Sequence, residues 1–471
     1  MTLPRRDLAD DALAAPFEAL RDELDVPAAF PPAVVAAAEE AAARGPSGDR
    51  EDATDLPLVT IDPPGARDLD QALGVTDGPA RGLVVHYAIA DVAAFVRPGD
   101  PVDVEAWDRG VSRYSPDVVT PLHPPALSEG AASLLPGEDR PAVLWTLTVD
   151  ATGELTGTAV RRATVRSRAQ LTYADAQRAI DAGTDAMLLR LSRLGRLRAE
   201  REWVRGGVSL ELPDQEVHRT DDGRWDLRYR APLPVESWNA QVSLLTGHAA
   251  GRLMVDAGVG VLRTLPAPAG DAIDDLRRRA WAFGLPWPVE IDYPAFVRTL
   301  DPHVAVEAAM LSAAAVGLRG AGYAAFDGEV PPLHRHEAIA AVYAHVTAPL
   351  RRLVDRYAAE VALAVAADVP VPGWVTDRLA DLPTAMARAR GRAAALDRAV
   401  LDLVEVQVLA DRLGQEFAAT VLRTSDRGSD LQLRHPAVTV RVDEQLDPGT
   451  EVRVRAVAVD VGARTTTVEV V

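Results

Sequence analysis

The sequence predicts an α+β protein in which a mixed sheet with packed helices is followed by a small C-terminal β-barrel. Two observations predict this class. Short apolar runs separated by Pro- and Gly-rich loops precede a long region of helical periodicity, and five short β-like runs follow it within residues 416–470. The chain has 471 residues, of which 48% are hydrophobic, enough for roughly two to four domains with sizeable cores.

The composition restricts the chemistry. The net charge is −19, which is unusual for a nucleic-acid binder, although a basic channel can lie inside an acidic shell. The sequence has no lysine, so a phosphate contact must use arginine or a backbone N–H group. It has no cysteine, which excludes disulfides and thiolate metal sites. Without an apolar signal core or a long apolar stretch, we expect a soluble, cytoplasmic protein that does not contact a membrane.

Residues 1–50 are expected to be a short helical region. Helical periodicity covers Leu8–Leu24 and Ala33–Ala43, and the sequence Gly-Pro-Ser-Gly at 45–48 then interrupts the chain. A larger part is expected over residues 55–412. Its first half should contain strands, of which the clearest are Leu56–Ile61, Leu83–Ala90 and Ala142–Val149.

Helices should dominate from Tyr173 to about Arg412. Within them, Arg205–Arg230 reads as a β-hairpin that turns at residues 221–223, and the last long helix should end near Gly414. Five strands are then expected over residues 414–471: Glu416–Leu422, Asp430–Leu433, Val438–Val442, Glu451–Val459 and Thr465–Val470. This spacing fits an OB-type barrel, although Phe417 is its only aromatic residue and predicts weak stacking on bases.

Three carboxylates lie close together in the segment from Thr60 to Gln71. Asp62 ends an apolar run, a type II turn is expected at Pro64-Gly65, and Asp68 and Asp70 share a face if the returning segment is extended. Converging carboxylates suit a hard cation such as Mg²⁺ or Mn²⁺. On spacing alone, a solvated acidic turn is the commoner explanation of such a motif.

Further motifs follow in a fixed order: Arg-Gly-Val-Ser-Arg-Tyr-Ser-Pro at 109–116, Thr-Pro-Leu at 120–122, Leu-Ser-Glu-Gly at 127–130, Ser-Leu-Leu-Pro-Gly at 133–137, residues 165–173, and residues 343–352. Together with the acidic segment, they resemble the catalytic RNB domain of the ribonuclease II/ribonuclease R family over residues 55–412. The barrel resembles the family's RNA-binding OB domain. The first 50 residues are too short for the cold-shock domains that precede the catalytic domain in many members.

The resemblance implies a metal-dependent 3′-to-5′ exoribonuclease that converts single-stranded RNA to nucleoside 5′-monophosphates, with no obligate protein partner evident. Asp62, Asp68 and Asp70 would hold Mg²⁺, with Mn²⁺ as an alternative. Asp68, Asp70 and Arg351 would be catalytic, with Arg351 neutralising charge on the phosphate. Gln71 occupies the position of the family's fourth aspartate. Because a carboxamide is neutral and a weaker metal ligand, full activity depends on this residue.

The same comparison assigns RNA contacts to Tyr114, Tyr173, Arg351, Gln241 and Asp397. Tyr114 would pack against the terminal nucleotide and Tyr173 would line the RNA path. The competing interpretations make Tyr114 a half-buried loop tyrosine and Tyr173 a core tyrosine at a helix start. Asp355 is expected to orient an arginine. The Arg277–Arg279 run could contact RNA, but a solvated helix face is the simpler explanation.

Two other functions remain open from the sequence. A catalytically weakened RNA-binding or regulatory protein would explain Gln71. A hydrolase of small molecules would use the same carboxylates but would not bind RNA oligonucleotides.

Overall fold

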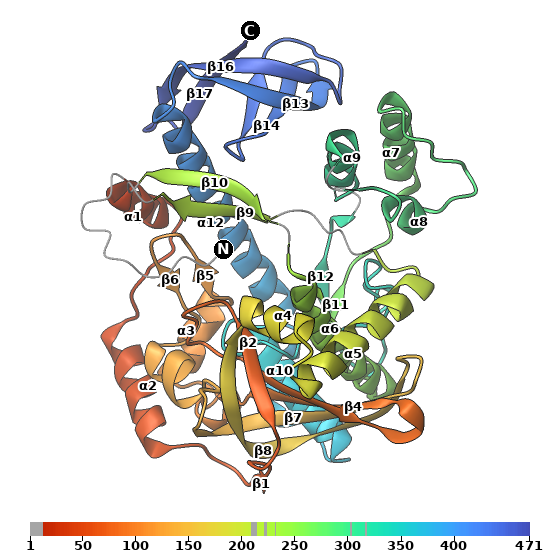
Figure 1. Ribbon diagram of the computed structural model, residues 1–471. Coiled ribbons are helices and arrows are strands. Elements are labelled where there is room, and N and C mark those ends of the chain that lie inside the picture. The colour runs from red at the N-terminus through yellow and green to blue at the C-terminus, as the bar shows by residue number, and fades with distance from the viewer. Residues whose placement is uncertain (1–12, 209–213, 221–223, 231, 302–303, 316–317) are drawn as a thin grey trace.

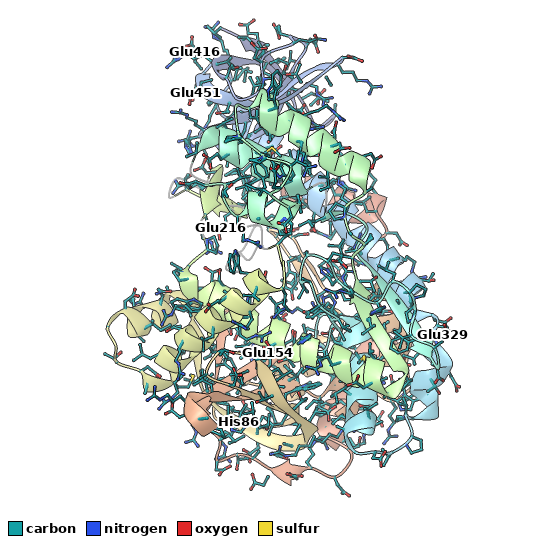
Figure 2. All side chains as sticks on the ribbon, turned by 90° about the vertical axis from the view of Figure 1, so that its right-hand side faces the viewer. His86, Glu154, Glu216, Glu329, Glu416 and Glu451 are labelled. Carbon is teal, nitrogen blue, oxygen red and sulfur yellow. The ribbon has the colours of Figure 1, made fainter. Side chains whose placement is uncertain are left out.

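The computed structural model describes residues 13–208, 214–220, 224–230, 232–301, 304–315 and 318–471. The large sheet and the helices packed on it fill one end of the molecule, and the barrel lies at the other end beyond the long helix α12 (Leu382–Ala410) (Figure 1). Figure 2 shows the same separation, with His86 of the sheet far from Glu416 and Glu451 of the barrel. None of the helices in these ranges is long and apolar enough to cross a membrane.

The N-terminal region contains the two expected helices, although residues 8–12 lie outside the described ranges. Helix α1 (Ala14–Glu23) buries Phe17 and Leu20 in a core that it shares with α12 and the barrel. Helix α2 (Pro32–Arg44) buries small residues such as Ala38 beside α3 (Pro101–Arg109). Both helices therefore pack on the larger part of the molecule.

The main sheet has the strand order β1-β8-β2-β3-β4-β7. Its strands are β1 (Glu51–Asp52), β2 (Leu58–Asp62), β3 (Gln71–Asp77), β4 (Leu83–Ala90), β7 (Asp139–Val149) and β8 (Leu155–Thr172). Strand β8 runs parallel to β1 and β2 but antiparallel to β7, so the sheet is mixed. The three strands predicted from apolar runs are confirmed as β2, β4 and β7.

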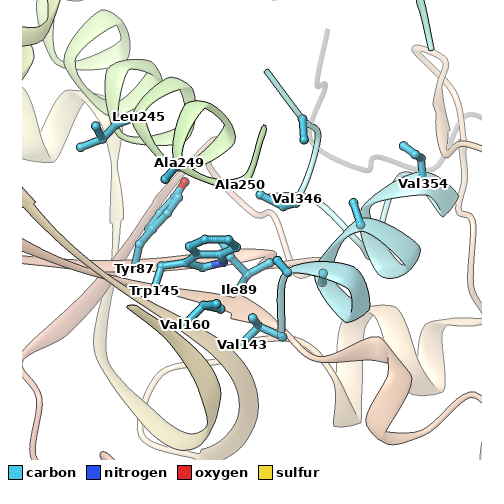
Figure 3. Close-up of a cluster of buried hydrophobic side chains, with 14 of the residues drawn as sticks. Tyr87, Ile89, Val143, Trp145, Val160, Leu245, Ala249, Ala250, Val346 and Val354 are labelled. Atoms are coloured by element: carbon cyan, nitrogen blue, oxygen red, sulfur yellow. The ribbon is translucent and has the colours of Figure 1, made fainter. Parts of the chain in front are cut away.

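Helices cover one face of this sheet. Tyr87 and Trp145 are fully buried there, below Leu245 and Ala249 of α6 (Pro234–Ala257) (Figure 3). The helices α4 (Tyr173–Asp181), α5 (Ala186–Val204), α10 (Leu353–Ala366) and α11 (Gly373–Leu379) contribute to the same core as Tyr87 and Trp145. Helix α4 begins at Tyr173 because Thr172 and Asp175 form a reciprocal capping box.

A small helical group lies between the sheet and the barrel. It contains α7 (Gly270–Ala282), α8 (Tyr293–Val297) and α9 (Ala305–Ala315), and its own core includes Phe296 and Met310. Strands β11 (Val259–Thr264) and β12 (Gly322–Asp327) pair antiparallel on either side of this group in the sequence. The sequence had predicted mainly helices here, so this pairing is an addition.

The hairpin and the barrel agree with the sequence. Strands β9 (Asp214–Arg219) and β10 (Trp225–Arg230) pair antiparallel, while the expected turn at 221–223 lies outside the described residues. The barrel strands are β13 (Glu416–Ser425), β14 (Gly428–Leu433), β15 (Thr439–Val442), β16 (Glu451–Asp460) and β17 (Thr465–Val470). They form an antiparallel sheet in the order β15-β14-β13-β16-β17, and because its edge strands approach each other the barrel is nearly closed.

Candidate active site

The acidic segment connects β2 to β3 through the expected turn. Gly65 has a φ of 79°, and the Ala66 amide donates to the carbonyl of Pro63 at 3.2 Å, as in a type II turn. The Gln170 side chain donates to the Ala66 carbonyl at 2.8 Å. Asp62 therefore ends one strand while Asp70 immediately precedes the next.

Ser133 fixes the returning half of this segment. Its buried hydroxyl accepts a hydrogen bond from the Leu69 amide at 3.0 Å and donates to the Arg67 carbonyl at 2.5 Å. The Leu134 amide also donates to the Leu69 carbonyl at 3.0 Å. Sequence reasoning had included Ser133 in a motif without assigning it this role. A small hydroxyl residue in a Pro- and Gly-rich loop gave no other signal.

Asp70 and Arg351 form the central pair of the site. The Asp70 side chain is almost fully buried, and its Oδ1 accepts from the Leu350 amide at 2.8 Å. Its Oδ2 accepts from Arg351 Nε at 3.0 Å. The Arg351 side chain is 46% exposed, and its terminal nitrogens have no hydrogen-bond partner among the described residues. The guanidinium is thus held at one edge and open at the other.

Arg352, the next residue in the chain, pairs with the buried Asp355 and not with Asp70. Asp355 is fully buried, and it accepts hydrogen bonds from Arg352 Nε and Nη2, both at 2.8 Å. It also accepts from the Ala348 amide at 2.7 Å. The prediction that Asp355 orients an arginine is confirmed, and the same contacts hold the turn that presents Leu350 and Arg351 to Asp70.

The two remaining aspartates have different surroundings. Asp68 Oδ2 accepts from the Tyr114 hydroxyl at 2.9 Å, and Tyr114 lies on the short strand β5 (Arg113–Tyr114), which pairs with β6 (Val119–Thr120). Asp62 Oδ2 is buried and receives no hydrogen bond from any described residue. Asp62 therefore has an unused acceptor oxygen, and its charge interacts with that of Asp68.

Burial changes the acid strength of two of these groups. Burial raises the pKa of Asp62 to about 6, with the charge of Asp68 adding to the effect and Arg351 opposing it. Burial also raises the pKa of Asp70 to about 7, although Arg351 and the Leu350 amide favour its ionised form. Both shifts follow from placing several carboxylates where water reaches them poorly.

Tyr173 lies on the Asp62 side of the site. It is the first residue of α4, and burial raises the pKa of its hydroxyl, with the charge of Asp62 adding to the rise. The side chain of Asn239 on α6 lies near the same hydroxyl and opposes the rise in pKa. Tyr114 and Tyr173 are therefore adjacent to Asp68 and Asp62 respectively.

Gln71 uses both ends of its side chain for structural contacts. Its Nε2 donates to the Thr347 carbonyl at 2.7 Å, and its Oε1 accepts from the Tyr87 hydroxyl at 2.7 Å. Ser243 of α6 lies 2.8 Å from the same hydroxyl. Gln71 thereby links β3 and β4 to the turn before Arg351.

The other sequence-predicted residues have contacts elsewhere. Gln241 is buried and donates to Glu202 Oε2 at 2.7 Å, which joins α6 to α5. Asp397 is exposed on α12. In the described ranges, neither residue has a hydrogen bond to the acidic segment, and no three acidic or histidine side chains are grouped closely enough to hold an ion as they stand. The roles of these two residues in RNA binding stay predictions.

Two family models match the chain. The RNB domain matches residues 50–366, and the RNase II-type exonuclease C-terminal S1 domain matches residues 415–471. Ribonuclease R of Escherichia coli is 30% identical over 351 residues, which cover 70% of this chain and 42% of that protein. The chain thus spans about two fifths of the length of this relative.

Solved structures agree with the family models. RNase R of Mycoplasma genitalium, in complex with ribose-methylated single-stranded RNA, has a TM-score of 0.87 at 17% identity and covers 98% of this chain and 78% of its own. Yeast Ssd1, described as a pseudonuclease, has a TM-score of 0.69 at 17% identity over 84% of this chain and 51% of its own. The chain belongs to the RNB-domain family, with the fold of ribonuclease R and the C-terminal S1 domain of RNase II-type exonucleases.

Proposed function

We propose that this chain is a metal-dependent 3′-to-5′ exoribonuclease that hydrolyses single-stranded RNA to nucleoside 5′-monophosphates. The observation that carries the proposal is the pair of a buried Asp70 and a half-exposed Arg351 beside two further carboxylates, in a chain of the RNB family. A fixed guanidinium next to acidic oxygen donors suits phosphodiester hydrolysis, because the cation stabilises charge on the phosphate and the carboxylates can hold a metal ion.

The donor chemistry of Asp62, Asp68 and Asp70 fits a hard divalent cation. All three offer carboxylate oxygens, and the buried Oδ2 of Asp62 has no donor among the described residues. These three residues would hold Mg²⁺, with Mn²⁺ as the alternative. When bound, such an ion polarises a phosphate oxygen and lowers the pKa of a bound water. The cation is proposed from this chemistry and not from the present spacing of the side chains.

The side chains around the carboxylates supply the positioning. Because Arg351 contacts Asp70 through Nε, its two terminal nitrogens are free to donate together to a phosphate. Tyr114 orients Asp68, and the Leu350 amide orients Asp70. In this proposal the rings of Tyr114 and Tyr173 would contact the last nucleotides of the strand, since stacking on aromatic rings accepts any base.

A second candidate is an RNA-binding protein of the same fold with little or no nuclease activity. Gln71 favours it, because the residue at the fourth acidic position is neutral and already bonded to Thr347 and Tyr87. The fold similarity to a yeast pseudonuclease also favours it. The retained Asp70–Arg351 pair favours the enzyme.

The deciding experiment follows a 5′-labelled oligoadenylate with Mg²⁺ or Mn²⁺ and with EDTA as the control. We expect stepwise shortening from the 3′ end, release of adenosine 5′-monophosphate, no reaction in EDTA, and slow reaction of a strand with a blocked 3′ end. Intact RNA that nevertheless binds the protein would transfer the assignment to the second candidate.

A further inference from the structure

A cavity lies where α7 meets the barrel. Its volume is about 450 Å³. Arg279 and Phe283 line it from the end of α7, and Arg423, Thr424, Arg427 and Arg441 line it from β13, the following turn and β15. Figure 1 shows the group of α7 and α9 beside this end of the barrel.

The junction that forms the cavity is closely packed. Gly449 of the barrel has a φ of 84°, and a Cβ atom on it would lie 3.2 Å from Val306 of α9 and 3.5 Å from the Phe283 ring. A Cβ atom at this position would therefore be in tight contact with Val306 and in van der Waals contact with Phe283. This contact holds Phe283 at a fixed distance from the barrel arginines.

The cavity carries an excess of positive charge in a chain whose net charge is −19. Four of its lining residues are arginines and none is acidic. Arg423 and Arg441 share a single carboxylate, Asp430, and Arg279 shares Asp275 with Arg278. Arg427 has no acidic partner among the described residues. Each shared carboxylate leaves a guanidinium partly uncompensated, so the cavity attracts anions.

Other arginines of the barrel are balanced. Arg453 and Arg455 both pair with Glu416, and Arg455 also pairs with Glu469. These exposed pairs are ordinary solvated contacts. The charge imbalance is therefore a property of the cavity and not of the barrel as a whole.

The barrel has too few aromatic residues to stack on a base, so an aromatic contact must come from outside it. Phe417 is its only aromatic residue, and only 7% of it is exposed, so the barrel cannot stack on a base by itself. Phe283 reaches the cavity from the helical group instead. The ring and the arginines come from different parts of the chain and meet only at this junction.

We propose that this cavity binds one nucleotide unit of single-stranded RNA upstream of the 3′ end that occupies the active site. The phosphate would contact Arg427 and Arg441, and the base would lie against the Phe283 ring. The proposal rests on the exoribonuclease function and names a second contact for the same strand. It explains how an acidic protein with an aromatic-poor barrel retains a long RNA.

The test measures equilibrium binding of the full chain to a fluorescent oligoadenylate, in EDTA and over a series of salt concentrations. The strand is longer than the roughly 16 nucleotides that one OB fold covers. Replacing Arg427 and Arg441 together by Ala should weaken binding about tenfold or more and reduce the salt slope by about 0.7, the value for one phosphate of a single strand, because phosphate contacts release counterions. Phe283→Leu should weaken binding about fivefold and leave the salt slope unchanged.

Matched controls separate this site from general effects. Arg453→Ala removes an exposed barrel arginine that is paired with Glu416, and Trp281→Leu removes an 84% exposed aromatic of α7 that does not line the cavity. Both should bind RNA like the wild type. Equal losses in the controls, or no loss in the cavity variants, would overturn the proposal.

Two further measurements test whether the ligand is an RNA strand or a free anion, and whether a negative result refutes the cavity or the nuclease function. Excess adenosine 5′-monophosphate or pyrophosphate should not displace the oligonucleotide; displacement that depends on Arg427 and Arg441 would make the cavity a site for free anions and overturn the strand contact. Weaker binding in the cavity variants of a protein that releases no nucleotide would support the cavity and refute only the nuclease. Normal nuclease activity with unchanged binding would refute only the cavity.

Discussion

Asp70 and Gln71 are neighbours in the chain, but their side chains have opposite functions. Asp70 is buried against the Leu350 amide and Arg351, where it holds a charged group that is open to solvent. Gln71 is bonded to Thr347 and Tyr87, where it joins the sheet to the turn before Arg351. Successive residues at a strand start face opposite sides, so a neutral residue at one position does not remove the charge pair at the other.

The largest effect should come from removing the charge of Asp70. Asp70→Asn keeps the shape and one acceptor but removes the charge that holds Arg351, so the rate of nucleotide release should fall on the order of 10³-fold. RNA binding in EDTA should change little. Asp77→Asn is the matched control, since that carboxylate lies exposed on β3 in a pair with Arg190. An Asp70 variant that cleaves normally would refute the assignment.

The pKa of Asp62 predicts a pH-dependent cost of folding in the metal-free protein. Its pKa rises from 3.8 to about 6 on folding, so the folded state binds the extra proton, and stability is lost as pH rises through this range. In EDTA at pH 7, Asp62→Asn should therefore be more stable than the wild type by about 2 kcal/mol, allowing for the solvent that reaches this side chain.

Urea unfolding at several pH values measures this difference. The advantage of Asp62→Asn should shrink as the pH is lowered and disappear at about pH 3, below both pKa values, where the wild-type carboxyl is protonated in both states. Saturating Mg²⁺ should stabilise the wild type more than the variant if Asp62 holds the ion. A difference that is independent of pH would contradict the buried acidic oxygen at this position.

Replacing the neutral Gln71 should have a smaller effect, on the stability of the fold. Gln71→Glu replaces the donor to the Thr347 carbonyl by an acceptor, so two oxygens would face each other and the free energy of unfolding should fall by about 1.5 kcal/mol. Tyr87→Phe should cause a similar loss, and the double variant should lose less than the sum, because the two residues share one network.

Chemical denaturation together with nuclease rates tests which function Gln71 has. Thr76→Ser, on the same strand, controls for general disturbance of β3. If Gln71→Glu were as stable as the wild type and more active with Mg²⁺, Gln71 would belong to the metal site, and the contrast with Asp70 would be wrong.

Local signals explain why much of the fold was predictable. Three of the four connections between the barrel strands have a glycine in or next to them, at Gly428, Gly449 and Gly462, and the Pro64-Gly65 turn is set by the φ of one glycine. The pairing of β11 with β12 was missed because its partners are separated in sequence by a whole helical group. The extent of β8 was missed because its polar and apolar residues do not alternate regularly.

In the candidate site too, contacts between segments far apart in the sequence could not be predicted. The carboxylates and Arg351 could be named from motifs, whereas the function of Gln71 could not, because its amide contacts a carbonyl 276 residues away in the sequence. Ser133 also acts on a distant segment, at Arg67 and Leu69. A sequence motif indicates which residues gather, but the direction of each side chain depends on the packed structure.

The smallest expected effect concerns Tyr114, whose hydroxyl donates a hydrogen bond to the carboxylate of Asp68. Tyr114→Phe removes the hydroxyl that donates to Asp68 but keeps the ring, so the rate should fall about tenfold, the lower end of the range for one hydrogen bond to a charged group. If the ring also supports the terminal nucleotide, Tyr114→Ala should raise the KM for RNA further, whereas Tyr114→Phe should affect mainly kcat. Steady-state kinetics of both variants separates the two contributions. Equal kinetics for Phe and Ala would leave the hydroxyl as the whole contribution, and Tyr114 would then be a positioning residue for Asp68 without a nucleotide contact.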